Sequence, residues 1–465
     1  MHEADRPHDT AAVLCAGLGR DTATGHRSWR LLADALAVAG YTTLRFDYPG
    51  CGDSCDTDGG DAFAGWQQGL DAAIDWTLAA TGTLPGAPRI VLIGLRFGAA
   101  LATLAAIGRH DIVGLVQLEP VLRGRSYVAQ LTTVARLRGQ PAGAALIVDE
   151  LVLSAAATRR MAELDLRQAA PGCPVALFST AGGTFAGLEP LLRPTHLADE
   201  PDIDPTRLLS WLRTAAPWHP TGLPTPTVAS VPLRPEGCIE TPQQFGEAGR
   251  LFGMLCQPTD QAGGAVVVMV NPGGDPHHGY ARFSVEFARR LARAGIASLR
   301  MDFAGLGDSA NPNEATTHVF EADRSRDIAA ALDALAALGY RRFALHGLCS
   351  GAYHAFKAAL AEPRITTLLL VNLPWFNLRF EKPGPHSVAR RGMEALAARP
   401  CRTLLLFAAG DPGLKPLVQQ FGLAGEALQS PCAEVAILST LDHDLTGPAM
   451  RQEAAEHMIR FLAAG

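Results

Sequence analysis

The sequence lacks any apolar run long enough to cross a lipid bilayer. Its best candidate, residues 265–270, has the length of a strand, whereas a spanning helix needs about 20 apolar residues. Residues 1–6 are polar and lack the apolar segment of a secretion signal. The nine cysteines, an odd number, show no secreted framework spacing. These absences predict a protein with reduced thiols, no membrane span and a cytoplasmic location.

Charge of either sign is also scarce. Charged residues make up 18% of the chain, below the usual quarter or so, and the formal net charge is −6 over 465 residues. With this net charge, the sequence does not indicate a basic surface that would bind a nucleic acid. Cys51 and Cys55 flank a short turn, but no second pair or nearby histidine cluster accompanies them, which argues against a metal site. We therefore expect no metal and no cofactor.

The chain contains an internal repeat with a period of about 250 residues. Residues 43–54 match residues 298–309, and residues 90–98 match residues 343–351 in the same order. In both copies apolar runs of strand length alternate with amphipathic runs of helical length, which predicts parallel sheets covered by helices. The predicted fold class is therefore α/β, with two tandem domains that form a pseudo-dimer.

Composition places the boundaries between these copies. The first domain is predicted at residues 1–216, with an inserted helical lid at about 121–168, and a proline-rich linker follows at 217–236. The second domain is predicted at 237–465. It begins with two strand-like runs that read as an added antiparallel hairpin, and its counterpart of the lid, residues 375–399, is about half as long.

A short motif in the second copy indicates nucleophilic catalysis. Gly347-Leu348-Cys349-Ser350-Gly351 lies between an apolar run of strand length and a helical run. Strand, Gly-x-nucleophile-x-Gly and helix form the nucleophile elbow, in which small residues permit a sharp turn that lifts the central side chain above the sheet. Cys349 is therefore the predicted nucleophile. A helix N-terminus and a neighbouring imidazolium both lower a thiol pKa.

Two partners for Cys349 follow it in the order that this motif requires. Asp411 lies in the loop after the apolar run 403–407, and His443 lies in the loop after the next such run. Both would arrive at the edge of the sheet where Cys349 lies. His443 would accept the thiol proton and later protonate the leaving group, while Asp411 would orient the imidazole. Asp442 is the alternative acid, but a residue adjacent to the histidine rarely points back at its ring.

An oxyanion hole can be predicted from the backbone. One donor would be the N–H of Ser350, and a second would come from the glycine-rich loop after the first strand of this copy. Pro272 has no N–H, so Gly273 or Gly274 is the better candidate.

Further polar residues lie in the same region. His277 and His278, in the glycine-rich loop, would either touch substrate or be solvated; the sequence leaves both open. Asp302 and Asp308 have counterparts in the first copy, which lacks a nucleophile, so we expect them to stabilise turns.

The first copy lacks the nucleophile and the acid that the second copy has. Arg96 occupies the nucleophile position, and the loop at 179–183, which corresponds to the acid loop, carries no carboxylate. A guanidinium serves neither as nucleophile nor as base at physiological pH. We therefore expect this half to be inactive. Arg96 would bind a substrate anion such as a carboxylate or phosphate, or would pair with a local acid such as Glu119.

With these residues in place, both halves resemble the α/β-hydrolase superfamily over nearly the whole chain. More narrowly, residues 46–54 and 94–98 resemble type-two exosortase A system-associated hydrolases, and residues 347–351 resemble the type-one kind. This resemblance implies a bacterial, cytoplasmic protein encoded near polysaccharide or secondary-metabolite pathways, with poorly defined substrates. The cysteine elbow is also similar to dienelactone hydrolases and polyhydroxyalkanoate synthases, but the chain departs from both outside the triad.

The predicted function is transfer or hydrolysis of an acyl group, from a small-molecule or carrier-bound thioester or ester, through a cysteine acyl-enzyme. A thiolate attacks a thioester at little thermodynamic cost, which favours thioesterase or acyltransferase chemistry over plain ester hydrolysis. Two alternatives stay open: a dienelactone-type ester hydrolase, and a non-catalytic scaffold or acyl-carrier-binding module in which Cys349 is merely retained.

Overall fold

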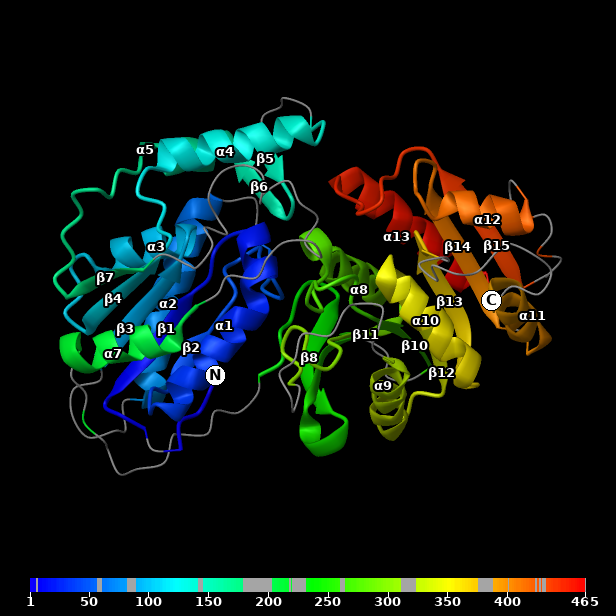
Figure 1. The fold of residues 1–465 in the computed structure, drawn as a ribbon, viewed down its shortest axis with the longest axis horizontal. Coiled ribbons are helices and arrows are strands. Elements are labelled where there is room, and N and C mark those ends of the chain that lie inside the picture. The colour runs from blue at the N-terminus through cyan, green and yellow to red at the C-terminus, as the bar shows by residue number, and fades with distance from the viewer. Residues whose placement is uncertain are drawn as a thin grey trace. The chain divides into compact units, whose positions relative to one another are not determined.

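The computed structural model describes the chain outside residues 6, 57–60, 82–88, 141–144, 179–202, 217–218, 220–230, 260–263, 311–322, 375–387, 400, 423–424, 426–427, 429–431 and 465. It divides into two compact units, unit 1 (Met1–Ser230) and unit 2 (Val231–Gly465) (Figure 1). Each unit contains a helix-covered, mostly parallel sheet, as the predicted fold class requires. Most of the predicted linker lies outside the described residues.

Among the described residues, the sheet of unit 1 has five strands in the order β2-β1-β3-β4-β7, and their pairings are parallel. Its strands are β1 (Thr10–Cys15), β2 (Thr43–Arg45), β3 (Arg89–Leu95), β4 (Ile112–Leu118) and β7 (Val175–Phe178). Alternate residues of β1 and β3 enter two different apolar clusters. One cluster contains α1 (Arg20–Val38) and α7 (Pro205–Ala215), and the other contains α2 (Ala62–Thr81) and α3 (Phe97–Ala106). Both faces of the sheet are therefore covered.

The predicted lid of unit 1 is less helical than the sequence indicated. It contains α4 (Gly124–Leu137) and α5 (Ala155–Glu163), but a hairpin of β5 (Ala145–Val148) and β6 (Leu151–Ser154) lies between them. Burial alternates along β6, a period of two that four residues display too briefly to be recognised. Leu151 packs against the loop after β1, near Gly19. The lid therefore covers the carboxyl edge of the sheet, and Figure 1 shows α4 and α5 crossing the top of unit 1.

The sheet of unit 2 has eight strands in the order β15-β14-β13-β12-β10-β11-β9-β8. The antiparallel pair β8 (Cys238–Phe245) and β9 (Leu251–Pro258) lies at one edge, which confirms the predicted hairpin. The parallel strands are β10 (Ala265–Met269), β11 (Ala297–Met301), β12 (Arg342–Leu348), β13 (Ile365–Val371), β14 (Arg402–Ala408) and β15 (Ala433–Leu438). All of the parallel strands end at the same edge.

Helices cover both faces of this sheet as well. The helices α8 (Phe283–Arg293) and α13 (Pro448–Ala463) share an apolar cluster with one face. The other face packs against α9 (Ser325–Ala337), α10 (Ser350–Ala361), α11 (Val388–Ala398) and α12 (Leu414–Phe421). Of the shorter counterpart of the lid, residues 375–387 lie outside the described residues.

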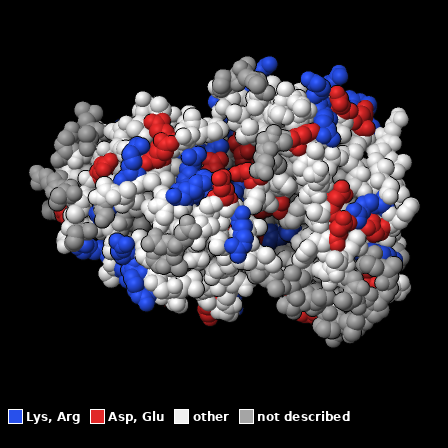
Figure 2. All heavy atoms as spheres, turned by 180° about the vertical axis from the view of Figure 1, so that it is seen from behind, with Lys and Arg blue, Asp and Glu red and all other residues white. Residues whose placement is uncertain are grey.

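The surface carries no single-sign field on the face drawn in Figure 2. There, the Lys and Arg side chains of the described residues lie in mixed groups with Asp and Glu side chains. This mixture agrees with the small net charge of −6. Among the described helices, none has the length and apolar character to cross a membrane.

Candidate active site

The turn that carries Cys349 has the strained backbone of a nucleophile elbow. Cys349 is the N-cap of α10 and has φ 52° and ψ −123°, a conformation that a non-glycine residue adopts only at a cost of about 1–3 kcal/mol. A Cβ on Gly347 would lie 2.2 Å from the backbone of Gly351, and one on Gly351 would lie 2.8 Å from the carbonyl of Asn271. Both glycines of the motif are therefore required by close backbone contacts.

His443 joins the two other predicted residues. Its Nδ1 lies 2.5 Å from Oδ2 of Asp411, and the Cys349 side chain is close enough to the ring to raise its pKa. The Asp411 side chain is 1% exposed, and its other oxygen accepts the N–H of Gly413 at 2.7 Å. These side chains follow β12, β14 and β15, so the parallel strands bring residues far apart in sequence to one edge of the sheet.

The charge on His443 follows from these contacts. The hydrogen bond to Asp411, followed by the nearby Cys349 side chain, raises the pKa of His443 to about 11, and partial burial of the ring opposes this. The imidazole therefore keeps its second proton throughout the neutral range.

Asp442, the alternative acid, is engaged elsewhere. Its Oδ1 accepts the N–H of Thr446 at 2.9 Å, and its Oδ2 accepts the Thr446 hydroxyl. This carboxylate caps the turn before α13. Of the two carboxylates considered from the sequence, Asp411 is the one that contacts the His443 ring.

Asn372 is part of the site and was missed from the sequence. It follows β13, is fully buried and has φ 48°. Its Nδ2 donates to the carbonyl of His443 at 2.8 Å, and its Oδ1 accepts the N–H of Ala408 at 2.8 Å. Asn372 thus ties the histidine loop to the end of β14. A polar residue directly after the apolar run at the end of β13 was the available signal, and Glu119 holds the same place in unit 1 with φ 44°.

The two candidate oxyanion glycines differ in their hydrogen bonds. The N–H of Gly273 donates to the hydroxyl of Ser350 at 2.7 Å, and Ser350 is buried. Gly274 is exposed, and within the described part of the chain no hydrogen bond is recorded from its N–H. The Ser350 side chain therefore holds the glycine-rich loop against α10 through Gly273 and not through Gly274.

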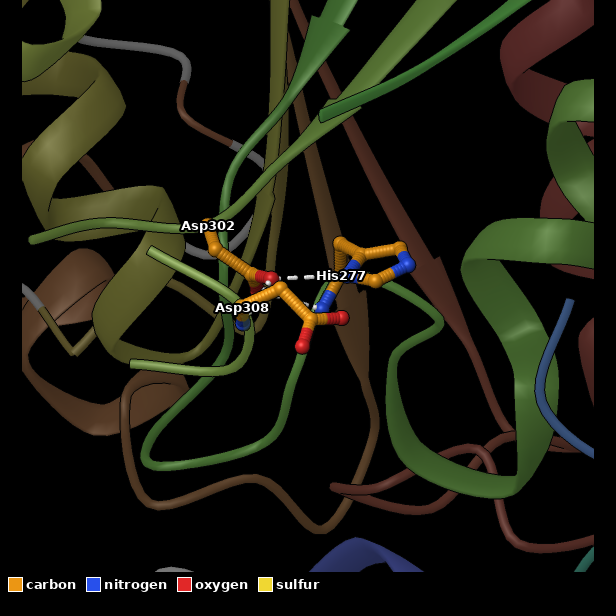
Figure 3. A group of neighbouring side chains, drawn as sticks. All are labelled: His277, Asp302 and Asp308. Carbon is orange, nitrogen blue, oxygen red and sulfur yellow. Dashed lines mark hydrogen bonds and ion pairs between the residues drawn. The ribbon is translucent and has the colours of Figure 1, made fainter. Parts of the chain in front are cut away.

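A buried network holds the base of the same loop. Asp302 is fully buried; its Oδ1 accepts the N–H of His277 at 2.6 Å and Nδ2 of Asn271 at 2.8 Å, and its Oδ2 accepts the N–H of Asp308 at 2.9 Å. His277 Nδ1 lies 2.7 Å from Oδ2. Figure 3 shows the Asp302 carboxylate directed at His277, with Asp308 beside them.

This network bears on two points: whether these side chains bind a metal ion, and whether His277 and His278 contact substrate or solvent. His277, Asp302 and Asp308 lie close enough together to be considered as metal ligands, but a cation would have to displace donors from both Asp302 oxygens. The group serves instead to stabilise the turn, as predicted for Asp302. His277 and His278 are 4% and 2% exposed, so the expectation that they could be solvated is wrong, and their burial does not favour substrate contact.

Unit 1 keeps the elbow without the nucleophile. Arg96 is the N-cap of α3 with φ 53° and ψ −117°, close to the values at Cys349. Its Nε lies 3.6 Å from Oδ2 of Asp21, and its guanidinium lies 5.9 Å from the centre of the Tyr127 ring. Asp21 is therefore a local acid that pairs with Arg96. The corresponding acid loop at 179–183 lies outside the described residues.

The Arg96–Asp21 pair is largely buried, and this burial affects the pKa of the Asp21 carboxyl. The side chains are 11% and 4% exposed. Burial raises the pKa of the Asp21 carboxyl, and the charges of Arg96 and, to a smaller extent, Arg20 oppose this rise. Arg96 therefore balances a charge inside its own unit, which favours the structural alternative over a substrate anion.

Comparison with known proteins places the chain among hydrolases. Residues 12–243 match the family described as Alpha/beta hydrolase family, and no curated protein matches. A dienelactone hydrolase from Anabaena variabilis is 17% identical, with a TM-score of 0.38 over 49% of this chain and 99% of that one. An α/β serine hydrolase without lid from Xanthomonas campestris is 20% identical, with a TM-score of 0.35 over 50% and 97%. A Pyrococcus furiosus esterase is 16% identical, with a TM-score of 0.37 over 48% and 92%.

Proposed function

We propose that unit 2 transfers or hydrolyses the acyl group of a thioester or ester through an acyl-Cys349 intermediate, which is in line with the match of residues 12–243 to the α/β-hydrolase family. The observation that carries this proposal is the position of His443, whose Nδ1 lies 2.5 Å from Asp411 and whose pKa is raised by Asp411 and then by the nearby Cys349 side chain. That chain of contacts is what a thiol needs to act as a nucleophile near neutral pH.

Acylation follows from these contacts. The Cys349 thiolate attacks the carbonyl carbon of the substrate while His443 holds the proton. Negative charge then develops on the carbonyl oxygen, within reach of the N–H groups of Ser350 and Gly274. Collapse of this intermediate breaks the bond to the leaving thiol or alcohol, which takes the proton from His443. Acyl-Cys349 and a neutral imidazole remain.

Deacylation reverses the roles. Neutral His443 takes a proton from water, an amine or an alcohol as that group attacks acyl-Cys349. The thiolate leaves, and the imidazolium–thiolate pair is restored. Asp411 keeps the imidazole in one tautomer and stabilises its charge through both steps.

The cysteine favours thioesters over oxygen esters. Exchange between two thioesters is nearly balanced, so a thiolate accepts an acyl group from a thioester at little cost. The acyl-enzyme remains reactive enough to pass the group to an amine or hydroxyl. Thioesterase or acyltransferase chemistry is therefore preferred to plain ester hydrolysis. In the proposal unit 1 is non-catalytic, because Arg96 stands where the nucleophile would be.

Alkylation tests the proposed nucleophile without a known substrate. Iodoacetamide is applied across about pH 5 to 9, and the Cys349 peptide is followed by mass spectrometry. Cys55 is exposed and serves as the internal reference thiol. We expect Cys349 to be alkylated faster than Cys55 at the lower end of this pH range.

Two variants make the result specific. Asp411→Asn should slow the labelling of Cys349 at low pH, whereas the matched change Asp442→Asn should not. Acyl transfer is then checked with an acyl thioester, by the mass of the acyl-protein and its removal by hydroxylamine. If Cys349 labels no faster than Cys55 and forms no acyl adduct, the catalytic proposal fails and the binding-module alternative takes its place.

A further inference from the structure

The lid of unit 1 contains a cavity that no part of the proposed mechanism uses. It has a volume of about 420 Å³ and lies between α4, α5 and β5. Its apolar lining includes Ala135, Leu146, Ala155 and Ala162. Small-molecule sites in proteins are typically pockets of about 300–1,000 Å³, mostly apolar with a few placed polar groups, and this cavity fits that description.

The charged side chains that line the cavity are both arginines. Arg136 on α4 and Arg159 on α5 both line it, and both are exposed. Within the described part of the chain, neither forms a recorded ion pair, and the lining includes no carboxylate. The Thr158 hydroxyl also lies at the cavity, buried and without a recorded partner among the described residues. Two guanidinium groups are therefore available to one ligand.

This combination selects a class of ligand. Guanidinium groups bind carboxylates through paired hydrogen bonds, and the alanines and Leu146 provide a surface for an aliphatic chain. A water molecule occupies about 30 Å³, so the cavity has room for about fourteen groups of that size. A carboxylate with a chain of about eight to ten carbons fits within that volume.

We propose that the lid cavity of unit 1 binds a medium-chain aliphatic carboxylate, with the carboxylate at Arg136 and Arg159 and the chain along Ala135, Leu146 and Ala162. Unit 1 would then act as a ligand-binding unit, although its elbow carries Arg96 in place of a nucleophile. The proposal is independent of catalysis in unit 2.

Calorimetric titration of the full-length protein with hexanoate, octanoate and decanoate tests the proposal. We expect one saturable site per chain. Affinity should rise by about fourfold for each buried methylene and should fall as salt screens the guanidinium groups. Decanol should bind at least tenfold more weakly than decanoate, and the decylammonium ion should not compete. Equal binding of decylammonium and decanoate would overturn the proposal.

Variants locate the site. Replacing both Arg136 and Arg159 by alanine should weaken decanoate binding at least tenfold, whereas Arg125→Ala, on the same helix but outside the cavity, should not. Ala162→Phe should abolish binding by filling the cavity. Ala155→Phe, at an exposed position, repeats the test should the first variant fail to fold, as judged by circular dichroism. Unchanged decanoate binding in a folded cavity-filling variant would refute the proposal.

Discussion

Replacing Arg96 with methionine should destabilise unit 1, because the Asp21 carboxylate would stay buried without its nearest cation. Removing one partner of a buried ion pair costs about 3–5 kcal/mol. Arg20 also lowers the pKa of Asp21 and remains in the variant, so we expect the lower end, about 3 kcal/mol. For a folding unit of this size, about 2–4 °C per kcal/mol gives a fall in Tm of about 6–12 °C.

The loss should depend on pH. Burial already raises the pKa of Asp21, and Arg96 is the largest influence opposing it, so the variant raises the folded-state pKa further above the unfolded value of about 3.9. Between these two values the folded state binds more protons, and stability falls as pH rises. The deficit should therefore be largest at high pH and should shrink as pH falls toward the raised folded-state pKa of Asp21.

Tryptophan fluorescence can follow this change selectively. Four of the six tryptophans, Trp29, Trp66, Trp76 and Trp211, lie in the described part of unit 1. Thermal and urea unfolding of the variant should therefore report mainly on that unit.

A second variant and a control make the result decisive. Adding Asp21→Asn to the Arg96 variant should recover most of the lost stability, since the buried charge is then gone. Arg167→Met, which breaks an exposed pair with Asp165, should leave Tm unchanged. An unchanged Tm for the Arg96 variant at pH 8, or no recovery in the double variant, would refute the assignment of the pair.

The catalytic unit gives three further predictions. Asp411→Asn should lower kcat/KM for an acyl thioester by about 10³–10⁴. It should also move the alkaline limb of the pH profile to lower pH, because the largest cause of the raised His443 pKa is removed. Steady-state kinetics checks this against Asp442→Asn, which should keep that limb. Ser350→Ala should slow acylation about fivefold, because it removes a hydrogen bond of about 1 kcal/mol that holds the oxyanion loop. Stopped-flow kinetics measures the acylation rate, and an unchanged rate would show that the hydrogen bond has no such role. Asn372→Leu should reduce stability by about 1–3 kcal/mol through unpaired buried backbone groups, measured by urea unfolding; an unchanged midpoint would contradict it.

Much of the fold was predictable because its signals are local. The elbow motif is readable because Gly347 and Gly351 are required by backbone contacts within a few ångströms, and any larger residue would collide there. The repeat, the parallel sheets and the added hairpin follow from the order and length of apolar runs. Parallel strands end at one edge, so the sequence also predicted that Cys349, Asp411 and His443 would lie near one another. Whether they act together in catalysis remains a prediction.

Only the tertiary structure decided which of several polar neighbours meet. Asp442 is adjacent to His443 in sequence, yet Asp411 reaches the ring, because a neighbouring strand delivers it and Asn372 holds the loop in place. Gly273 and Gly274 are alike in sequence, but the Ser350 hydroxyl engages only the first. Arg96 pairs with Asp21, in the first turn of α1, to which local pattern does not connect it. Hydrogen-bond partners of this kind depend on how loops from different strands pack, and local propensity contains no information on that packing.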